Sequence, residues 1–476
     1  MPLMNPWHPV LHDALRGRAV PVLDFSDAVI PAASVWTAAR GWVQAFRSAG
    51  LTPGDRVVLC LPPSPAFVAV LVAGLWEGLT VAVADPATPA ASSLERFDAR
   101  LAVGVSGGEA VAVPRYSNPP EAMPALRAGR TPPTPQACLL LRTSGTSGAG
   151  KAVALTARGV LSVLESHLPR MEMHDAVVAS VLPWHHSFGL VLELLASVVA
   201  GAVVVRVPTG GRDPTALLTH VRDRGVTHLS GVPLMFKRLL ELPDGEALVR
   251  TLRGGIVGGA PVSERLATQL AGTRLCAGYG QTEASPGVTL GEPGVWRRGL
   301  LGRAVGCEVK LTPRGTLAFR GDNAFAGYFD PDHGGLQTRP CNRLEDGWVD
   351  TGDVAEETPD GWVYLGRADD TFKLSNGRRV EAGRVEAGLC RTLPGVDDAV
   401  VFTDDGERLF VALDVADGAT MPHWSEVGAA MGSLGTYLAG VFPLPKSSAV
   451  RTAKGAVDRR GLLHLAGTGR AAARAA

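Results

Sequence analysis

Thr143-Ser144-Gly145-Thr146-Ser147-Gly148-Ala149-Gly150-Lys151 is the stretch that decides the fold of this chain. It follows an apolar run at residues 137–141 that predicts a buried strand. Its three glycines let the backbone approach a ligand closely, while amide N–H groups, four hydroxyls and Lys151 offer hydrogen-bond donors and positive charge. A Gly- and Ser-rich loop is often only a flexible turn, but the preceding strand and the terminal Lys151 favour a loop that binds phosphate.

The same loop partly matches the nucleotide-binding pattern G-x-x-x-x-G-K-[ST]. Residues 145–151 satisfy its first seven positions, but the eighth is Ala152, so the hydroxyl that would hold Mg²⁺ is missing. Residues 152–156 are apolar and β-prone, whereas that pattern requires the start of a capped helix. The pattern therefore fails both in its chemistry and in its structural context.

Length and composition limit the class of protein. The chain has 476 residues, of which 46% are hydrophobic and 19% charged, which predicts a large globular enzyme of two or more domains. Lys+Arg and Asp+Glu balance at 46 each, so no net charge indicates nucleic acid or a membrane as partner. Six scattered cysteines without a C-x-x-C pair, no signal pattern and no long apolar run predict a cytoplasmic protein without a membrane span.

Apolar periodicity predicts alternating helices and strands up to about residue 276, and hence an α/β domain of mostly parallel sheets covered by helices. The expected helices are 35–49, 66–76, 159–166, 190–199, 214–225 and 232–242, and the expected strands are 56–61, 80–83, 177–182, 202–207, 227–231, 252–256 and 273–276.

Beyond about residue 295, turns rich in Gly, Pro and Asp separate short β segments and predict a β subdomain at about 295–367. After residue 367, helices at 384–391 and 423–438 and extended segments at 396–402 and 408–414 predict a small α+β domain. The expected division is therefore a large N-terminal domain at 1–367 and a C-terminal domain at 368–476.

Four further motifs follow the loop along the chain. Gly258-Gly259-Ala260-Pro261 offers a surface poor in side chains, on which a flat ring or an acyl chain can lie. Gly278-Tyr279-Gly280-Gln281-Thr282-Glu283 combines an aromatic ring for a purine, a hydroxyl for a phosphate and a carboxylate for Mg²⁺. The segment at 347–353 ends in Asp353, which suits two ribose hydroxyls, and Arg367 supplies a cation. Each motif alone is also an ordinary turn, whereas their order is specific.

In this order the motifs closely resemble those of the adenylate-forming superfamily, over roughly residues 30–460. That superfamily includes acyl-CoA synthetases, aryl-acid ligases, peptide-synthetase adenylation domains and luciferases. The resemblance implies a large domain with the ATP and substrate sites and a small mobile C-terminal domain. It further implies that a carboxylate attacks the α-phosphorus of ATP, giving acyl-AMP and pyrophosphate, before transfer to a thiol. The implied cofactors and partners are ATP, Mg²⁺ and either CoA or the pantetheine of an acyl carrier protein.

The resemblance also implies roles for single residues. The loop would hold the β- and γ-phosphates, Tyr279 would flank adenine, Thr282 would meet the α-phosphate, Glu283 would bind Mg²⁺, Asp353 would hold the ribose and Arg367 would assist. Asp369 takes the position of the hinge. The full set expected to bind ATP or AMP is Thr143, Ser144, Gly145, Thr146, Ser147, Gly148, Lys151, Gly258, Gly259, Ala260, Pro261, Gly278, Tyr279, Gly280, Gln281, Thr282, Asp353 and Arg367.

The segment at 183–189 resembles the P-x-x-H-x-x-G motif of acyl- and aryl-CoA synthetases, and it places His186 where the family lines its acyl pocket. By the same resemblance Val232, Phe236, Gly258 and Gly259 are further pocket walls. The alternative for His186 is a half-buried side chain bonded to a backbone carbonyl. Amino-acid-activating domains usually carry an Asp in this segment, and none is present, so an acyl or aryl acid is favoured over an α-amino acid.

One departure from the family pattern concerns catalysis. The segment at 450–460 resembles P-x-T-x-x-G-K-[IV]-x-R, but the position of the usual catalytic Lys is Ala456. Three explanations are open. The first is that Lys454 substitutes for the missing Lys, since two residues along an extended chain are only about 6.6 Å apart. The second is that the position was engineered to arrest adenylation. The third is that this branch adenylates without the Lys, slowly or with a different acid or acceptor.

The acceptor also stays open at this stage. The loop at 373–381 is one residue longer than the family form; Lys373 and Gly377 are expected to line the thiol path, because glycine lets pantetheine pass close to the backbone. Arg378 and Arg379 either meet a phosphate of CoA or a carrier protein, or form a solvated turn. Two rival functions follow: an amine or intramolecular nucleophile uses the adenylate, or the chain is a catalytically impaired binder of nucleotide or acyl-AMP.

Overall fold

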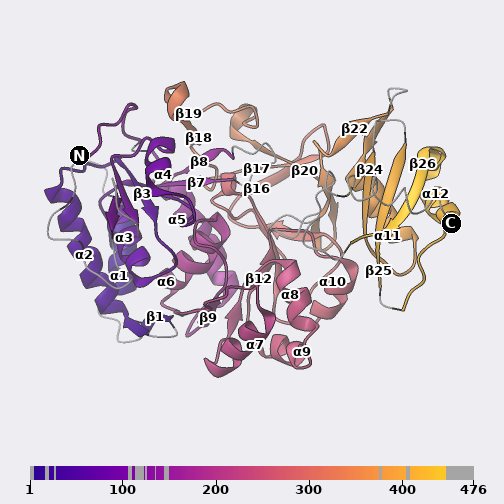
Figure 1. The fold of residues 1–476 in the computed structure, drawn as a ribbon, viewed down its shortest axis with the longest axis horizontal. Helices are drawn as coiled ribbons and strands as arrows, with labels where there is room; N and C mark the ends of the chain where they lie inside the picture. The colour runs from indigo at the N-terminus through magenta and orange to yellow at the C-terminus, as the bar shows by residue number, and fades with distance from the viewer. Residues whose placement is uncertain are drawn as a thin grey trace.

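The computed structural model has a large N-terminal α/β domain beside a small C-terminal domain of helices and strands, as the sequence predicts (Figure 1). It describes residues 5–16, 21–25, 28–104, 110–112, 119, 123, 126–134, 136–143, 150–374, 378–403, 408–416, 418–445 and 462.

The first sheet of the N-terminal domain carries Thr143 and Lys151, the two ends of the loop that the sequence predicts to bind phosphate. Its strand order is β19-β18-β8-β7-β4-β3-β5-β6. Five strands run parallel: β3 (Arg56–Cys60), β4 (Thr80–Val83), β5 (Leu101–Gly104), β6 (Ala110–Ala112) and β7 (Leu139–Arg142). Three strands add in antiparallel fashion: β8 (Ala152–Leu155), β18 (Gly327–Asp330) and β19 (Gly335–Gln337). The two strands predicted on either side of the loop are thus β7 and β8, which form a hairpin.

Two more sheets complete this domain. The second has the order β11-β9-β10-β1-β2 and is parallel except for its last pair. Its strands are β1 (Pro21–Phe25), β2 (Ala28–Pro31), β9 (Val177–Ser180), β10 (Val203–Arg206) and β11 (His228–Leu229). The third has the order β12-β13-β14-β15-β21-β20-β17-β16 and is mostly antiparallel. Its strands are β12 (Ile256–Gly258), β13 (Cys276–Tyr279), β14 (Thr289–Leu290), β15 (Leu300–Ala304), β16 (Glu308–Leu311), β17 (Thr316–Arg320), β20 (Val349–Thr358) and β21 (Gly361–Arg367).

The helices cover these sheets, and α3 shows why. This helix (Pro65–Trp76) is apolar on every face, and so it is stable only when it is buried between other layers. It begins at Pro65, and the Ser64 hydroxyl caps it by accepting the N–H of Phe67 at 3.2 Å. The other helices of this domain are α1 (Trp7–Leu15), α2 (Ala32–Ser48), α4 (Ala90–Arg96), α5 (Ala157–Met171), α6 (Ala196–Ala200), α7 (Pro214–Asp223), α8 (Pro233–Leu240), α9 (Gly245–Thr251) and α10 (Glu264–Leu270).

Two segments differ from the expected helices. The helix expected at 190–199 begins as a π-helix, Phe188–Leu195, and continues as α6. The helix expected at 423–438 is shorter: α12 (Trp424–Ala430) is followed by a 3₁₀ segment, Gly432–Tyr437. Gly432 has a φ of +57°, and this left-handed backbone ends the α-helix. No helix in the described part of the chain is long and apolar enough to cross a bilayer.

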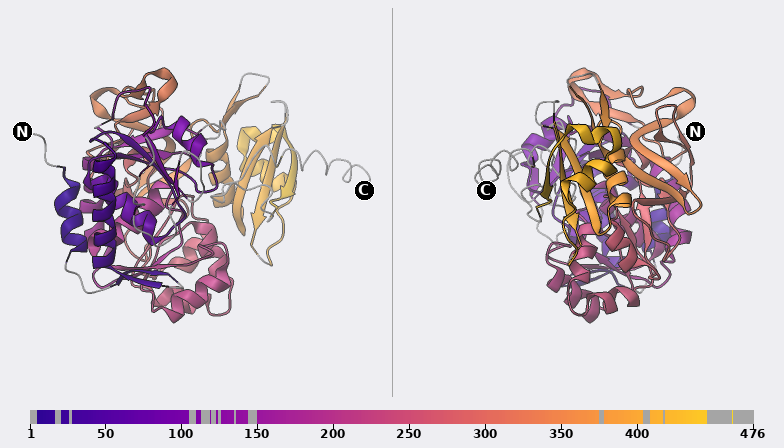
Figure 2. Two further views of the ribbon diagram at one scale, coloured as in Figure 1. Left: turned by 60° about the vertical axis from the view of Figure 1, so that its left-hand side comes forward. Right: turned by 90° about the vertical axis from the view of Figure 1, so that its right-hand side faces the viewer.

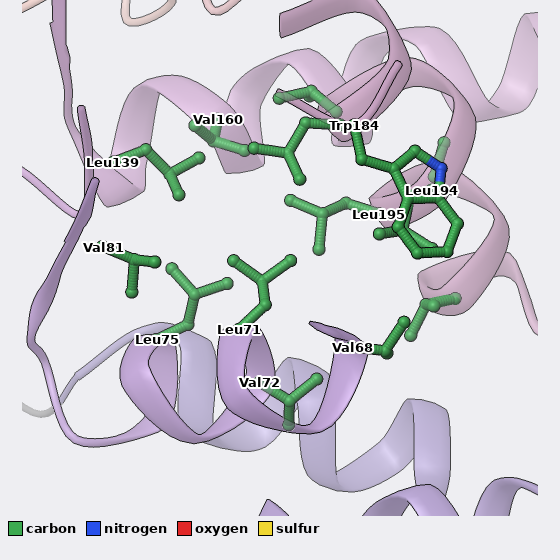
Figure 3. Close-up of a cluster of buried hydrophobic side chains, with 14 of the residues drawn as sticks. Val68, Leu71, Val72, Leu75, Val81, Leu139, Val160, Trp184, Leu194 and Leu195 are labelled. Atoms are coloured by element: carbon green, nitrogen blue, oxygen red, sulfur yellow. The ribbon is translucent and has the colours of Figure 1, made fainter. Parts of the chain in front are cut away.

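The main core lies between α3, the first sheet and the segment around Trp184 (Figure 3). Leu75 of α3 lies beside Val81 of β4 and faces Leu139 of β7, and Leu71, one turn earlier, points into the centre of the cluster. Each is almost fully buried, and burying such a side chain contributes about 1.5–3 kcal/mol. The core therefore fixes β7, and with it the start of the phosphate-binding loop.

The C-terminal domain encloses a core of its own and appears as a separate body (Figure 2). Its sheet has the order β24-β25-β26, and β22 pairs with β23. The elements are β22 (Thr371–Lys373), β23 (Arg379–Glu381), α11 (Ala382–Thr392), β24 (Val396–Thr403), β25 (Leu409–Val415), α12 and β26 (Leu438–Pro443). We propose that the boundary lies at 367/368. Two strands within the β subdomain proposed at 295–367, β18 and β19, pair with the first sheet instead of the third.

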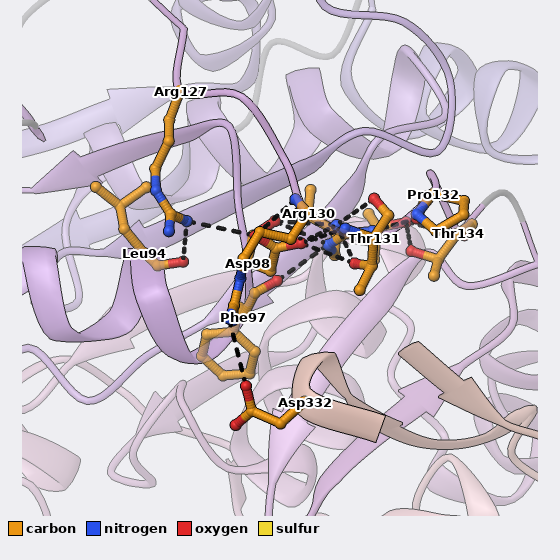
Figure 4. Close-up of polar contacts among 11 residues, drawn as sticks. Leu94, Phe97, Asp98, Arg127, Arg130, Thr131, Pro132, Thr134 and Asp332 are labelled. Atoms are coloured by element: carbon orange, nitrogen blue, oxygen red, sulfur yellow. Dashed lines mark hydrogen bonds and ion pairs between the residues drawn. The ribbon is translucent and has the colours of Figure 1, made fainter. Parts of the chain in front are cut away.

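A buried ionic cluster anchors the segment that leads into β7 (Figure 4). Asp98, which is 0% exposed, lies 3.1 Å from the Arg56 Nη2 atom and accepts the N–H groups of Arg130 at 2.8 Å and Thr131 at 2.7 Å. Arg56 also donates to the carbonyl of Pro132 at 2.6 Å. Burial alone would raise the pKa of Asp98, but the N–H groups of Arg130 and Thr131, the Thr131 hydroxyl and Arg56 together hold this pKa below its ordinary value.

Asp98→Asn is expected to lower the free energy of unfolding by about 3 kcal/mol, because it leaves the buried Arg56 cation without its anion. Because the folded pKa of Asp98 is lowered, the carboxylate's contribution is present at neutral pH and is lost as the pH falls through that pKa. The difference between wild type and variant in urea unfolding should therefore shrink in acid.

Glu246→Gln is the matched control for that substitution. It breaks the exposed pair of Glu246 with Arg250, at 2.9 Å, and should change the unfolding free energy by less than about 0.5 kcal/mol. Equal effects of the two substitutions would show that the Asp98 cluster does not stabilise the fold through its buried charge.

Candidate active site

The phosphate-binding loop closes the β7–β8 hairpin. The Thr143 N–H donates to the Lys151 carbonyl at 3.0 Å, and the Lys151 N–H donates to the Thr143 hydroxyl at 3.2 Å. The predicted residues Ser144, Gly145, Thr146, Ser147 and Gly148 lie outside the described residues. Because the loop joins two antiparallel strands, its context differs from the strand-to-helix turn of the pattern that Ala152 already excludes.

Lys151 and Glu283 approach the same side chain, Tyr328. The Lys151 Nζ atom lies 4.6 Å from the centroid of the Tyr328 ring, and the Tyr328 hydroxyl donates to the Glu283 Oε1 atom at 2.9 Å. Sequence reasoning missed Tyr328, because its place depends on the pairing of β18 with β8. The only local signal is an aromatic residue with a polar tip in a short β-forming segment.

Glu283 is suited to a magnesium ion that is shared with a nucleotide. Its side chain is 9% exposed, and it sits in a 3₁₀ turn, Thr282–Ala284, directly after β13. Mg²⁺ in proteins usually takes one or two carboxylates and completes its shell with phosphate oxygens and water, and Glu283 supplies one such carboxylate. Among the described residues, no group of three or more His, Cys, Asp or Glu side chains is arranged to hold a metal ion by itself.

Thr282 meets the segment at 183–189. Its hydroxyl lies 3.1 Å from that of Ser187, which is 8% exposed. His186 is half-buried in this segment, and its ring centroid lies 4.5 Å from that of His185. The contact between Ser187 and Thr282 joins the expected acid-binding segment to the expected α-phosphate motif, and His186 stays a predicted pocket residue.

A buried polar cluster around Glu193 holds the backbone that leads into the segment at 183–189. Glu193, 1% exposed in the π-helix, accepts the Ser180 hydroxyl at 2.6 Å and the N–H groups of Val181 at 3.1 Å and Leu182 at 3.2 Å. Burial raises the pKa of Glu193 to about 7, and the charge of Arg206 acts in the opposite direction. Arg206 donates to the Leu182 carbonyl at 2.9 Å. The backbone entering Pro183 is therefore fixed by hydrogen bonds rather than by packing alone.

At the other end of the site, Tyr279, Asp353 and Arg367 form one bonded group. The Tyr279 hydroxyl donates to Asp353 Oδ2 at 2.6 Å, and Arg367 Nη1 donates to Asp353 Oδ1 at 3.0 Å. Asp353 in β20 and Arg367 in β21 are register partners, so the sheet itself places them together. Burial raises the pKa of Tyr279 well above its ordinary value, and the charge of Asp353 adds to the shift.

Arg367 links this group to the domain boundary. Its Nε atom donates to Asp369 Oδ1 at 3.1 Å, so the predicted hinge residue is paired with a predicted nucleotide-binding residue. Burial raises the pKa of Asp353, whereas the cation of Arg367 lowers it. Beyond the boundary, the side chain of Lys373 and all of Gly377, Lys454 and Ala456 lie outside the described residues.

The two glycine-containing motifs lie side by side because β12 and β13 pair in parallel, with Gly258 opposite Gly278. A Cβ atom on Gly258 would lie 2.5 Å from the Gly278 carbonyl oxygen, so glycine is required there by the sheet itself. Val232 lies near Gly259, since a Cβ on that glycine would be 3.6 Å from Val232 Cγ1. Phe236, also a predicted pocket wall, is 0% exposed in the second hydrophobic cluster.

Two comparisons with known sequences identify relatives of this chain. Residues 32–329 match the sequence model of a family described as AMP-binding enzyme. A feruloyl-CoA synthase from Amycolatopsis is 28% identical over 428 residues, which cover 81% of this chain and 80% of the relative. A sulfoacetate–CoA ligase from Cupriavidus necator is 29% identical over 398 residues, covering 75% of this chain and 76% of the relative.

Solved structures share the fold. Apo MatB from Rhodopseudomonas palustris superposes with a TM-score of 0.74 at 21% identity, covering 97% of this chain and 99% of that one. The amide bond synthetase McbA from Marinactinospora thermotolerans gives 0.76 at 21% identity, with the same coverage of 97% and 99%. Because the family model spans more than half of the 476 residues, the chain belongs to the AMP-binding enzyme family of the adenylate-forming superfamily.

Proposed function

We propose that this chain activates an acyl or aryl carboxylic acid, other than an α-amino acid, as its acyl-AMP and transfers the acyl group to the thiol of coenzyme A. The observation that carries the proposal is the 3.1 Å contact between the hydroxyls of Ser187 and Thr282. Attack of a carboxylate on the α-phosphorus requires the two substrates to lie side by side, and the acid segment and the phosphate motif meet at this contact.

The proposed site residues supply charge and orientation. Lys151 and the loop neutralise the β- and γ-phosphates, Thr282 donates to the α-phosphate, and Asp353 accepts the ribose hydroxyls beside Tyr279 and Arg367. Glu283 would hold Mg²⁺, which supplies positive charge to the phosphate oxygens. Such groups suit a displacement at phosphorus, where catalysis is mostly positioning and electrostatic stabilisation.

The burial of Glu193 supports the preference against α-amino acids. The segment at 183–189 contains no carboxylate, and the next acid along the chain, Glu193, faces away into its own hydrogen-bonded cluster. An α-ammonium group therefore gains no anion from this stretch. The relatives named as CoA ligases support coenzyme A as the acceptor; a carrier-protein pantetheine is a further candidate acceptor. We also propose a cytoplasmic location, because all six cysteines are free thiols.

Ala456 favours one second candidate function, a binder of nucleotide or acyl-AMP with slow turnover. Without a cation at the family's Lys position, the charge that develops on the carboxylate and the α-phosphate has one counter-ion fewer. Capture of the adenylate by an amine or an intramolecular nucleophile is a further alternative within the enzyme class.

Pyrophosphate–ATP exchange with a panel of acids tests the reaction. Aliphatic, aromatic and sulfonated acids and α-amino acids are each supplied with Mg²⁺-ATP, and AMP and thioester are then measured with and without CoA. We expect exchange with at least one acyl or aryl acid and thioester formation only when CoA is present. Exchange supported by α-amino acids alone would contradict the proposed substrate class, and saturable ATP binding without exchange would favour the binder.

Asp353→Asn should raise the KM for ATP roughly 10-fold, because it weakens a charge-assisted hydrogen bond to the ribose as well as the pairing with Arg367. Asp360→Asn is the matched control, since that exposed carboxylate pairs with Arg297 at 3.6 Å on the surface of the same domain. An unchanged KM for ATP in the Asp353 variant, measured at saturating acid, would remove Asp353 from the nucleotide site.

Ala456→Lys should increase the single-turnover rate of AMP formation by about 10²-fold, the magnitude that one well-placed charged donor contributes to a transition state. Ala453→Lys adds the same charge three residues away and should leave the rate unchanged. If Lys454 already fills this role, Lys454→Ala will abolish adenylation in the chain that carries Ala456, and Ala456→Lys will have no effect. If the rate of AMP formation is unchanged in both Ala456→Lys and Lys454→Ala, the missing Lys does not limit the reaction.

A further inference from the structure

Tyr328 touches two charged groups that come from different motifs. Its hydroxyl is 2.9 Å from Glu283 Oε1, and its ring centroid is 4.6 Å from the Lys151 ammonium. Lys151 ends the phosphate-binding loop, and Glu283 ends the motif at 278–283. One side chain therefore contacts both the cation expected on the phosphates and the carboxylate expected on the metal.

The backbone holds Tyr328 in this place. β18 pairs with β8, and Tyr328 is the register partner of Val153, which follows Lys151 by two residues. The Tyr328 ring also packs against Phe325, with ring centroids 5.0 Å apart, and Phe325 is 1% exposed. A ring fixed by a strand and by a buried neighbour has few alternative rotamers, so the directions of its hydroxyl and its faces are set before a ligand binds.

Tyr328 makes a hydrogen bond to Glu283 and a cation–π contact with Lys151. A phenol that donates to one oxygen of a carboxylate orients its plane, and partners of this kind tune metal affinity by about 10- to 100-fold. A phenol carries its proton at neutral pH and a carboxylate can only accept, so the Tyr328 hydroxyl is the donor in this hydrogen bond. The ring face attracts the Lys151 ammonium by a cation–π interaction.

We propose that Tyr328 is a positioning residue of the nucleotide site. Through its hydroxyl it orients Glu283 for the metal ion, and through its ring it holds Lys151 at the mouth of the phosphate-binding loop. The inference rests on the proposed function, because it assigns these two groups to one metal–nucleotide complex. It also assigns the hydroxyl and the ring separate effects, which two substitutions can separate.

Tyr328→Phe removes only the hydroxyl, and Tyr328→Leu removes the ring face as well. We expect Tyr328→Phe to weaken the binding of Mn²⁺ to the complex with a non-hydrolysable ATP analogue roughly 10-fold, measured by electron paramagnetic resonance. Binding of the analogue without metal, measured by calorimetry, should stay within about twofold. Tyr328→Leu should in addition weaken this metal-free binding by about threefold, because Lys151 loses its cation–π partner.

Tyr437→Phe, at the end of the 3₁₀ segment of the C-terminal domain, is the matched control and should bind metal and analogue like the wild type. If the wild type shows no metal-dependent binding of nucleotide, the proposed function itself fails. If the wild type binds and Tyr328→Phe retains the wild-type affinity for Mn²⁺, the positioning role fails while the proposed function stands. Should Tyr328→Leu not fold, Tyr328→Phe still decides, because it loses a single oxygen atom.

Discussion

The pairing of β8 with a strand on each side is the constraint on which the phosphate end of the site depends. β7 pairs with one edge of β8, and the loop between Thr143 and Lys151 joins these two strands. β18 pairs with the other edge of β8 and carries Tyr328. β18 comes from the far part of the chain and leaves the β subdomain to join this sheet. Tyr328 on that strand contacts both Lys151 and Glu283, which belong to two different motifs.

Paired charges hold the rest of the site in a largely apolar domain. Asp353 meets Arg367 and Tyr279, Glu193 is held by three hydrogen-bond donors, and Asp98 is surrounded by Arg56 and backbone N–H groups. Buried charges are costly unless they are paired and hydrogen-bonded, so these clusters tolerate few other arrangements. They fix, respectively, the predicted nucleoside end of the site, the backbone before the predicted acid-binding segment and the approach to β7.

The two domains touch through charged groups close to the predicted pocket. Lys237 of α8 lies 3.4 Å from Asp414 of β25, and Arg298 donates to the carbonyl of Asp397 at 2.6 Å. Lys237 follows Phe236, a predicted pocket wall. Exposed and partly exposed ion pairs of this kind contribute only about 0–1 kcal/mol each. The predicted hinge residue Asp369 is bonded to Arg367 at the proposed boundary.

The sequence alone determined the fold class and the order of the motifs, and it predicted the phosphate-binding loop, since each motif depends on residues within a few positions of one another. It predicted β7 and β8, and it identified Thr282, Glu283 and Asp353 as candidate site residues. It overextended the helix at 423–438, because apolar periodicity does not report the left-handed turn at Gly432. The departure at Ala456 was also visible in the sequence, although its consequence is a matter for experiment.

Only the tertiary structure decided which of these residues meet. The contact of Ser187 with Thr282, the place of Tyr328 between Lys151 and Glu283, and the bond from Tyr279 to Asp353 all join segments that are remote in the chain. Strand order and register set these contacts, and local patterns of side chains carry no record of which strand will pair with which. The sequence thus specified the chemical groups, and the pairing of β8, β18, β20 and β21 placed them together.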